Sequence, residues 1–368
     1  MGAARKPRLV AIDQPGGPDF VDELRRIWND GDAAFPVDQR LPTAAKRAVC
    51  RAMAVGEEVE PGDALVVATS GSTGEPKGVV LTHDAVAASA EAATRRLDVR
   101  PDDHWLACLP LSHVGGLSVV TRALHTGTRL TVQPGFDPEQ VVGAGATLVS
   151  LVATALARID ADRFRTIVLG GSRPPADRPT NTVATYGMTE TGSGIVYDGV
   201  PLEGVEVDVR DDRSIRVRGP MLLRCYRDGT IPLDATGWFD TGDLGHWLDD
   251  GRLHVEGRRG ELIITGGENV WPERVERVLA DHPGVAEVMV RGVPDEEWGE
   301  LVEAVIVPAS AGRHPDTPTL ADLRAFVAER EPSFVAPRSL LITDRLPTTS
   351  LGKPRRSAEV RASRSERR

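Results

Sequence analysis

The stretch Thr69-Ser-Gly-Ser-Thr-Gly-Glu-Pro-Lys-Gly78 decides how the rest of this 368-residue chain is interpreted. It follows a short apolar run, Ala64–Thr69, which predicts a strand. Glycines let backbone N–H groups approach an anion, hydroxyls donate to its oxygens, and a lysine supplies a point charge. The stretch therefore predicts a phosphate-binding loop, with a plain surface turn as the alternative. It is not a P-loop, because Pro76 stands where that motif needs glycine. The residues assigned to phosphate binding are Thr69, Ser70, Gly71, Ser72, Thr73, Gly74 and Lys77.

Lysine is scarce in this chain, since only four of its 44 basic residues are lysine: Lys6, Lys46, Lys77 and Lys353. A lysine kept in such a composition indicates a position where a planar guanidinium cannot replace a compact ammonium. Lys77 lies in the loop above, and Lys353 lies in a second loop motif, Leu346-Pro-Thr-Thr-Ser-Leu-Gly-Lys353. The two motifs suggest one anionic ligand that is held from both sides.

Composition narrows the class of protein. The net charge of -10 argues against a nucleic acid or an anionic membrane as the main partner. The three cysteines are widely separated and odd in number, which favours a reducing cytoplasm. No signal-type apolar segment follows the start, and the longest apolar stretch is too short to span a bilayer. We expect a soluble cytoplasmic protein without membrane insertion, and a homodimer by default. The basic tail, Lys353–Arg368, is expected to be solvated and partly disordered.

From about residue 60 the pattern alternates between strand and helix. Thr82 is a predicted N-cap for an alanine-rich helix that reaches about Leu97. Gly127 is expected to close a second helix. Alternation of this kind predicts an α/β sheet with helices packed on its faces. The expected strands are Trp105–Leu109, Leu148–Val152 and Thr166–Leu169, and the second helix is Val114–His125.

The pattern of apolar, polar and charged residues changes twice after Gly199. Val205–Val209 and Ser214–Val217 alternate apolar and polar residues, which predicts a hairpin. Gly257-Arg-Arg-Gly260 is a charged, glycine-containing junction, so we predict a domain of residues 1–256 and a smaller α+β domain of residues 257–368. The expected elements of the smaller domain are the helices Pro272–Ala280 and Leu320–Glu329 and the strands Val285–Val290 and Val302–Val307.

Four further features carry weaker signals. In Tyr186-Gly-Met-Thr-Glu190, a carboxylate beside hydroxyls suits Mg²⁺ that bridges phosphate oxygens, although such a glutamate is more often simply solvated. Asp243, at the end of Gly237-Trp-Phe-Asp-Thr-Gly-Asp243, can accept from ribose hydroxyls or form an Asx turn. Arg258 alone indicates little more than a surface charge. His113, after a predicted strand, is more often a hydrogen-bonded wall residue than a catalyst.

Taken together and in this order, these segments resemble the adenylate-forming acyl-CoA synthetase superfamily. The resemblance rests on Thr69–Gly78, Leu109–His113, Tyr186–Glu190, Gly237–Asp243, Gly257–Pro272 and Leu346–Lys353, and covers roughly residues 61 to 356. It implies a large N-terminal α/β domain, a small mobile C-terminal domain, and an active site between them. About 60 residues precede the phosphate loop, fewer than the resemblance leads us to expect, so the N-terminal domain is predicted to be shortened.

The resemblance also implies roles for particular residues. Lys77 and its loop would grip the phosphates of ATP, and Gly170, Gly171, Ser172, Tyr186 and Gly187 would frame the adenine. Thr189 and Glu190 would serve phosphate and Mg²⁺, with Glu190 as the metal ligand. Asp243 and Arg258 would hold the ribose. Lys353 would bridge the substrate carboxylate and the α-phosphate as the catalytic lysine. His113, which is assigned to the catalytic residues as well, would line the acyl pocket. The acyl-adenylate would then react with the thiol of CoA.

Within the superfamily the chain is similar to the o-succinylbenzoate–CoA ligases of menaquinone biosynthesis. The similarity lies in its shortness, in Ser112–Leu124, in Ser150–Arg158 and in Gly266–Pro272. That substrate has a second carboxylate, which needs a donor or a cation if it is buried. The candidates are Arg122, Arg158, Ser118 and Thr154, with Gly115 and Gly116 as further acyl-pocket residues. The alternatives are another acyl- or aryl-CoA ligase, a protein that loads a carrier-protein thiol, and a nucleotide binder without turnover.

Overall fold

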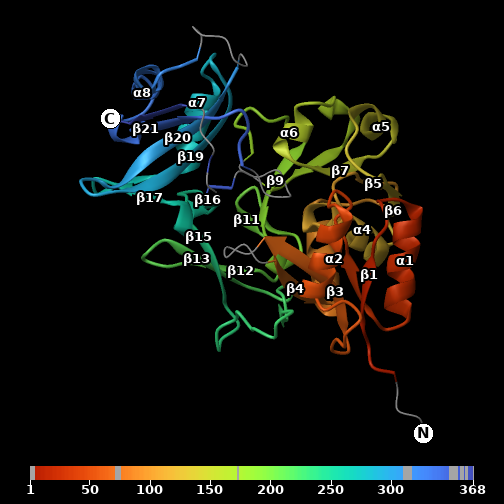
Figure 1. Ribbon diagram of the computed structural model, residues 1–368. Helices are drawn as coiled ribbons and strands as arrows, with labels where there is room; N and C mark the ends of the chain where they lie inside the picture. Colours follow the sequence, from red (N-terminus) through yellow and green to blue (C-terminus); the bar gives the residue numbers. More distant parts are fainter. Residues whose placement is uncertain are drawn as a thin grey trace. The chain divides into compact units, whose positions relative to one another are not determined.

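The structure is a computed structural model that describes residues 5–70, 76–171, 174–309, 317–347, 355–356, 360 and 364–367 (Figure 1). By contacts the chain divides into two units. The first comprises Met1–Thr241 with His246–Val255, and the second comprises Gly242–Gly245 with Glu256–Arg368. The fold is α/β, as the sequence predicts. In the part of the chain that the structure describes, no helix has the length and apolar composition needed to cross a bilayer.

The first unit contains a five-stranded sheet that carries the predicted phosphate loop. Its order is β1 (Leu9–Ile12), β2 (Ala33–Pro36), β3 (Asp63–Ser70), β4 (Pro76–Thr82) and β14 (Cys225–Tyr226). The first three strands are parallel, and β4 runs antiparallel to β3 and to β14. The residues before the phosphate loop thus add two strands and two helices, α1 (Pro18–Asn29) and α2 (Thr43–Ala52), to the fold.

Alternation along β3 explains why both faces of this sheet are covered. Leu65 and Val67 join the apolar cluster that contains the buried face of α1, whereas Val66 joins the cluster that contains Met53 at the end of α2. Successive side chains of a strand point to opposite faces, so α1 and α2 lie on opposite sides of the sheet (Figure 1).

The second sheet of this unit has seven strands in the order β11-β10-β9-β8-β7-β5-β6. Strands β9, β8, β7, β5 and β6 are parallel. The central strands β8, β7 and β5 are wholly buried, as expected when helices cover both faces, whereas β9 and the edge strand β6 are mostly half-buried. The strand bounds are β5 (His104–Ala107), β6 (Arg129–Val132), β7 (Leu148–Leu151), β8 (Thr166–Leu169), β9 (Thr182–Gly187), β10 (Gly194–Tyr197) and β11 (Val200–Pro201).

Local sequence signals at the helix ends predicted the two longer helices of this region, α3 and α4. Helix α3 (His83–Arg96) begins after Thr82, whose side chain accepts from the backbone N–H of Ala85. Helix α4 (Val114–Thr126) ends at Gly127, which is left-handed with φ of 70°. Both predictions are confirmed. The shorter elements are α5 (Pro138–Gly143), α6 (Ala153–Leu156), and the 3-10 helices η1 (Ala161–Arg163) and η2 (Thr189–Thr191).

A four-stranded sheet follows in the order β12 (Glu206–Val209), β13 (Ser214–Arg218), β15 (Phe239–Trp247) and β16 (Leu253–Arg258). Strands β12 and β13 are antiparallel, which confirms the predicted hairpin.

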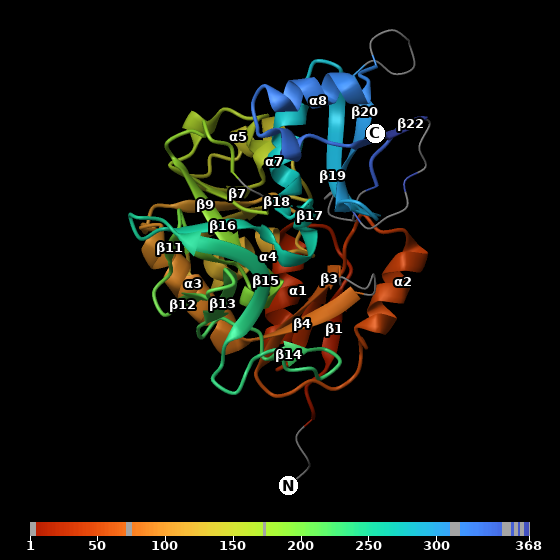
Figure 2. The same ribbon diagram turned by 90° about the vertical axis from the view of Figure 1, so that its left-hand side faces the viewer.

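The second unit is an α+β fold around a six-stranded sheet. The order is β18 (Glu268–Val270), β17 (Ile263–Thr265), β20 (Gly299–Pro308), β21 (Ser339–Ile342) and β22 (Arg364–Arg367), with β19 (Val285–Asp295) also paired to β20. Helices α7 (Pro272–Ala280) and α8 (Leu320–Ala328) bury their apolar faces in the same cluster as β20 and β21 (Figure 2). Short 3-10 helices are η3 (Arg259–Glu261) and η4 (Ser333–Val335). Within the predicted basic tail, Arg364–Arg367 form β22, whose backbone pairs with β21.

Candidate active site

The predicted phosphate loop connects two antiparallel strands. In the β3–β4 hairpin Thr69 pairs with Lys77 and Ser70 pairs with Pro76. Four of the predicted phosphate-binding residues, Gly71, Ser72, Thr73 and Gly74, lie outside the described residues, and so does the side chain of Ser70. The described ends show that Thr69 and Lys77 are cross-strand neighbours, so both sides of the loop start from one point of the sheet.

Lys77 is linked to the predicted metal ligand through Tyr226, which the sequence did not single out. The Lys77 ammonium lies over the Tyr226 ring, 5.1 Å from its centroid. The Tyr226 hydroxyl donates to Glu190 Oε1 at 3.0 Å. Tyr226 reaches this place because β14 pairs with β4, opposite Val79. The hairpin lysine and the carboxylate of η2 are therefore parts of one contiguous cluster, with Thr189 beside the carboxylate on η2.

The predicted adenine residues lie at the ends of two neighbouring parallel strands. Gly170 and Gly171 follow β8, while Tyr186 and Gly187 end β9. Ser172 lies outside the described residues. A Cβ on Gly187 would lie 2.3 Å from the Ser193 carbonyl oxygen, so this position requires glycine for the chain to return in β10. Because the carboxyl ends of parallel strands meet at one edge, these residues form a wall where α/β sheets bind ligands.

The two predicted ribose residues are paired with each other. Asp243 lies on β15 and is buried, while Arg258 ends the neighbouring β16 and is mostly exposed. Arg258 Nε lies 3.1 Å from Asp243 Oδ1. The buried Asp243 carboxylate is thus paired with a guanidinium that is mostly exposed.

His113 stands just before α4 and is held by residues from the N-terminal strands. Arg40 Nη2 lies 2.9 Å from His113 Nε2, and the carboxylate of Asp38 lies 3.6 Å from the same nitrogen. A guanidinium can only donate, so Nε2 is the acceptor in the contact with Arg40. Burial alone raises the pKa of Asp38, but hydrogen bonds from Arg40 outweigh it and lower the pKa overall. Asp38 and Arg40 carry no sequence motif and were missed.

The first turn of α4 needs small residues. A Cβ on Gly116 would lie 2.4 Å from the Leu109 carbonyl oxygen and 2.7 Å from that of Pro110. This glycine therefore lets the 109–113 loop fold closely against the helix that carries Gly115, Ser118 and Arg122.

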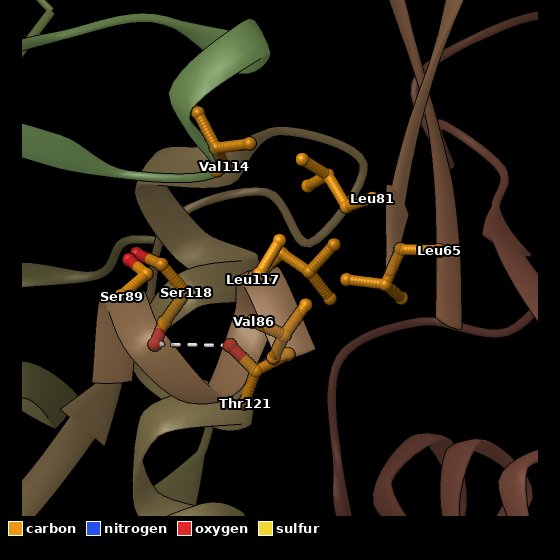
Figure 3. Close-up of a pocket in the computed structure, with 10 residues that line it drawn as sticks. Leu65, Leu81, Val86, Ser89, Val114, Leu117, Ser118 and Thr121 are labelled. Carbon is orange, nitrogen blue, oxygen red and sulfur yellow. Dashed lines mark hydrogen bonds between the residues drawn. The ribbon is translucent and has the colours of Figure 1, made fainter. Parts of the chain in front are cut away.

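A small cavity touches one of the predicted acyl residues. It is lined by apolar side chains of β3, β4, α3 and α4, with Ser118, Thr121 and Ser89 as polar neighbours (Figure 3). The Thr121 hydroxyl donates to the Ser118 carbonyl oxygen at 3.3 Å. With about 10 Å³ of space the cavity has room for one water and none for an aromatic acid.

Arg122 differs sharply from the other candidates for a carboxylate-binding residue. Its side chain is 2% exposed, and the guanidinium lies over the Trp105 ring at 5.0 Å. Nη2 donates to the Ser193 hydroxyl at 3.2 Å, whereas Nε and Nη1 are buried without a hydrogen-bond partner among the described residues. Such a cation is costly unless something pairs with it. Thr154 and Arg158 are exposed, and Arg158 stacks on Phe136 at 5.2 Å.

The predicted catalytic lysine, Lys353, lies outside the described residues, but Arg355 and Arg356 beyond it are described. Among the described residues no cluster of three or more His, Cys, Asp or Glu side chains could hold a metal by itself.

Comparison with known proteins gives consistent results. The family model for the AMP-binding enzyme matches residues 21–227, and the model for the AMP-binding enzyme C-terminal domain matches residues 274–353. A probable 2-succinylbenzoate–CoA ligase of Mycobacterium tuberculosis is 38% identical, covering 96% of this chain and 98% of the relative. A 2-succinylbenzoate–CoA ligase of Geobacillus kaustophilus is 36% identical, over 79% of this chain and 67% of the relative.

Comparison with solved structures points to the same group of enzymes as the sequence relatives. The o-succinylbenzoate CoA synthetase of Bacillus subtilis, in complex with its acyl-adenylate intermediate, matches with a TM-score of 0.87 and 27% identity, covering 98% of this chain and 90% of the other. The same enzyme in complex with ATP and magnesium ion matches with a TM-score of 0.84.

Proposed function

Because the chain belongs to the AMP-binding enzyme family, we propose that it is an o-succinylbenzoate–CoA ligase. It would use ATP to form an acyl-adenylate and then pass the acyl group to CoA, in menaquinone biosynthesis. The proposal is supported by the relatives, which cover almost the whole chain, and by the likeness to a structure that holds the acyl-adenylate. We assign ATP and acyl binding to residues 1–256, and delivery of the catalytic lysine to residues 257–368.

The first half-reaction needs fixed positive charge and positioning. Carboxylate attack on the α-phosphorus builds negative charge on the phosphoryl oxygens and on the departing pyrophosphate. Lys77 and the loop from Thr69 would hold the phosphates, and Lys353 would hold the α-phosphate beside the substrate carboxylate. Losing one such contact typically costs about 3–4 kcal/mol in the transition state.

The Lys77–Tyr226–Glu190 cluster fits a magnesium nucleotide. Mg²⁺ is commonly bound by one or two carboxylates together with substrate phosphates, and Glu190 supplies one carboxylate beside the phosphate loop. When bound, the ion would neutralise charge on the phosphate oxygens. Tyr226 would orient the Glu190 carboxylate by its hydrogen bond and restrain Lys77 by its ring.

The nucleoside would rest on the edge formed by β8 and β9. Gly170, Gly171 and Tyr186 would frame the adenine, and Asp243 with Arg258 would hold the ribose. His113 would line the acyl pocket, held by the contact of its Nε2 with Arg40.

The observation that carries the substrate assignment is Arg122. It is a buried cation on the predicted acyl helix with two nitrogens unpartnered among the described residues, and a second substrate carboxylate would supply the missing acceptor. A monocarboxylic acid would leave that cation unpaired. This separates the proposed substrate from benzoate or a short-chain fatty acid.

ATP–pyrophosphate exchange with a panel of carboxylic acids tests the proposal. We expect exchange with o-succinylbenzoate and little with benzoate or butyrate. Exchange with another acid alone would make the chain a different acyl-CoA ligase. Product on a carrier-protein thiol but not on CoA would make it a carrier-loading enzyme. No exchange with any acid would leave a nucleotide binder without turnover.

We also propose the class of ligand, the location and the oligomeric state of the protein. The net charge of -10 supports small molecules rather than nucleic acid as the ligands. A cytoplasmic homodimer is the default for such an enzyme. Light scattering on the purified chain tests the dimer.

A further inference from the structure

Arg356, three residues after Lys353, is bound by four groups from three separate segments of the second unit. Its Nε donates to the Val290 carbonyl oxygen at 3.0 Å. Nη1 lies 3.1 Å from Glu261 Oε2, and Nη2 lies 3.1 Å from Glu273 Oε1 and 2.9 Å from Glu276 Oε2. The side chain is only 16% exposed.

The main chain at this point is held as well. Arg291 Nη1 donates to the Arg356 carbonyl oxygen at 3.5 Å, and the Arg291 guanidinium is itself fixed by Glu303 at 2.7 Å. Both the backbone and the side chain of residue 356 are thus tied to β19. We refer to Arg356, Glu261, Glu273 and Glu276 as the Arg356 cluster.

The carboxylates of the cluster depend chiefly on the charge of Arg356, although Arg258 also acts on Glu261. Three carboxylates surround one guanidinium, so the group is short of positive charge. Burial raises the pKa of Glu276 and of Glu261, although Arg356 acts in the opposite direction on both. Glu273 Oε2 is buried without a partner among the described residues. Removing Arg356 would leave like charges together in a half-buried site, which is strongly unfavourable.

We propose that Arg356 is a positioning residue that anchors the Lys353 segment to the second unit. The inference rests on the proposed function, because it takes from it the role of Lys353 in adenylation. Three residues of chain span at most about 11 Å, so a fixed Arg356 limits where the Lys353 backbone can lie. The planar fork of arginine suits this task, since it makes several hydrogen bonds in fixed directions at once.

The Arg355 side chain supplies a matched control. It is adjacent and of the same type, yet it is exposed. In the described part of the chain, its one hydrogen bond runs from the backbone N–H to the Pro347 carbonyl oxygen at 2.8 Å. Arg356→Lys keeps a positive charge within the cluster but loses the fork. Arg355→Lys makes the same chemical change outside it.

The test measures the two half-reactions separately. For Arg356→Lys we expect ATP–pyrophosphate exchange to fall on the order of 100-fold, the usual effect of a displacement of about 1 Å in a catalytic group. Thioester formation from supplied acyl-adenylate and CoA should stay within about twofold of the wild-type rate, because Lys353 serves the first step. Arg355→Lys should alter neither rate.

A second measurement, which does not depend on catalysis, complements the two rate measurements. Amide hydrogen exchange of peptides covering residues 345–358 should be faster in Arg356→Lys than in Arg355→Lys, with peptides of β20 unchanged. The hydrogen-exchange measurement does not depend on the substrate. If the enzyme used a different acid, the proposed function would be refuted, but this comparison of the two variants would still hold.

Three results would overturn the inference: equal losses in both half-reactions, unchanged adenylation, or unchanged hydrogen exchange around residue 353. If Arg356→Lys unfolds the second unit, Glu276→Gln takes its place. That change keeps an acceptor for Val290 N–H but weakens the contact to Arg356. It should lower adenylation alone, on the order of tenfold, and an unchanged rate would refute the anchoring role.

Discussion

Replacing Arg122 by methionine should have opposite effects on stability and on activity. Among the described residues, the buried Arg122 guanidinium has one hydrogen bond, to Ser193, and one stacking contact, on Trp105. Its Nε and Nη1 are buried without partners among the described residues. A buried charge with so little compensation costs several kcal/mol of desolvation, more than the roughly 1 kcal/mol of the hydrogen bond and up to about 2 kcal/mol of the stack return.

Methionine has a similar volume and no charge. Replacement of buried ionic groups by apolar ones of similar size is neutral to stabilising by about 1–4 kcal/mol. Each kcal/mol shifts Tm by about 2–4 °C in a domain of this size. We therefore expect Arg122→Met to melt at the wild-type temperature or up to about 16 °C above it in the absence of substrate.

The same change should damage use of o-succinylbenzoate. Removing one partner of a buried charge pair costs about 3–5 kcal/mol, which corresponds to a fall in kcat/KM of roughly 10²–10⁴-fold. The other partner here would be the second substrate carboxylate. Benzoate, which lacks that carboxylate, should be used no worse than by the wild type.

The assay is a coupled measurement of AMP release with each acid, together with thermal melting of the free protein. Arg158→Met is the control, because Arg158 is exposed and stacks on Phe136 at the surface. A strong loss of stability in Arg122→Met with unchanged selectivity would refute the reasoning, since Arg122 would then be a structural core residue.

Four further results are expected. Lys353→Ala should abolish adenylation yet largely preserve thioester formation from supplied acyl-adenylate, and equal loss in both steps would argue against a role confined to the first. Lys77→Arg should weaken ATP use only modestly, because part of its role is charge; KM for ATP measures this, and complete loss would show that geometry dominates. Burial raises the pKa of Asp103, but hydrogen bonds, first from Arg165, outweigh this effect and lower the pKa overall. The ionised Asp103 therefore stabilises the folded protein at pH values above the usual carboxyl range, and this stabilisation is lost as the pH falls. Asp103→Asn should thus cost about 3 kcal/mol in urea unfolding at pH 7 and less near pH 3, whereas an equal cost at both would exclude the ion pair as the cause. Burial raises the pKa of Cys108 to about 12, so iodoacetamide should leave it unmodified in the folded protein at pH 8; rapid alkylation would contradict its burial.

The sequence predicted about half of the helices and strands beyond residue 60, and the helices among them carry local signals at their ends. Thr82 caps α3 and Gly127 closes α4, and each signal depends on only a few neighbouring residues. The strands Leu9–Ile12 and Ala33–Pro36 were not predicted, because four apolar residues fit a strand or a helix equally well.

The residues of the candidate site also fall into two groups: those that a local motif predicts, and those that only the fold brings together. Loop motifs located Thr69, Lys77 and Glu190, since each motif is contiguous in sequence. Tyr226 could not be found, because its link to Lys77 and Glu190 depends on the pairing of β14 with β4. Arg40 beside His113 and Arg356 among its glutamates are likewise contacts between distant segments, which no single stretch of sequence encodes.

Thioester formation with CoA, ATP and Mg²⁺ tests the central claim most directly, with o-succinylbenzoate compared against benzoate and butyrate. The account predicts a strong preference for o-succinylbenzoate, because only that acid offers a second carboxylate to Arg122. Turnover of benzoate or butyrate at an equal or higher rate would contradict it, while leaving the chain an adenylate-forming ligase.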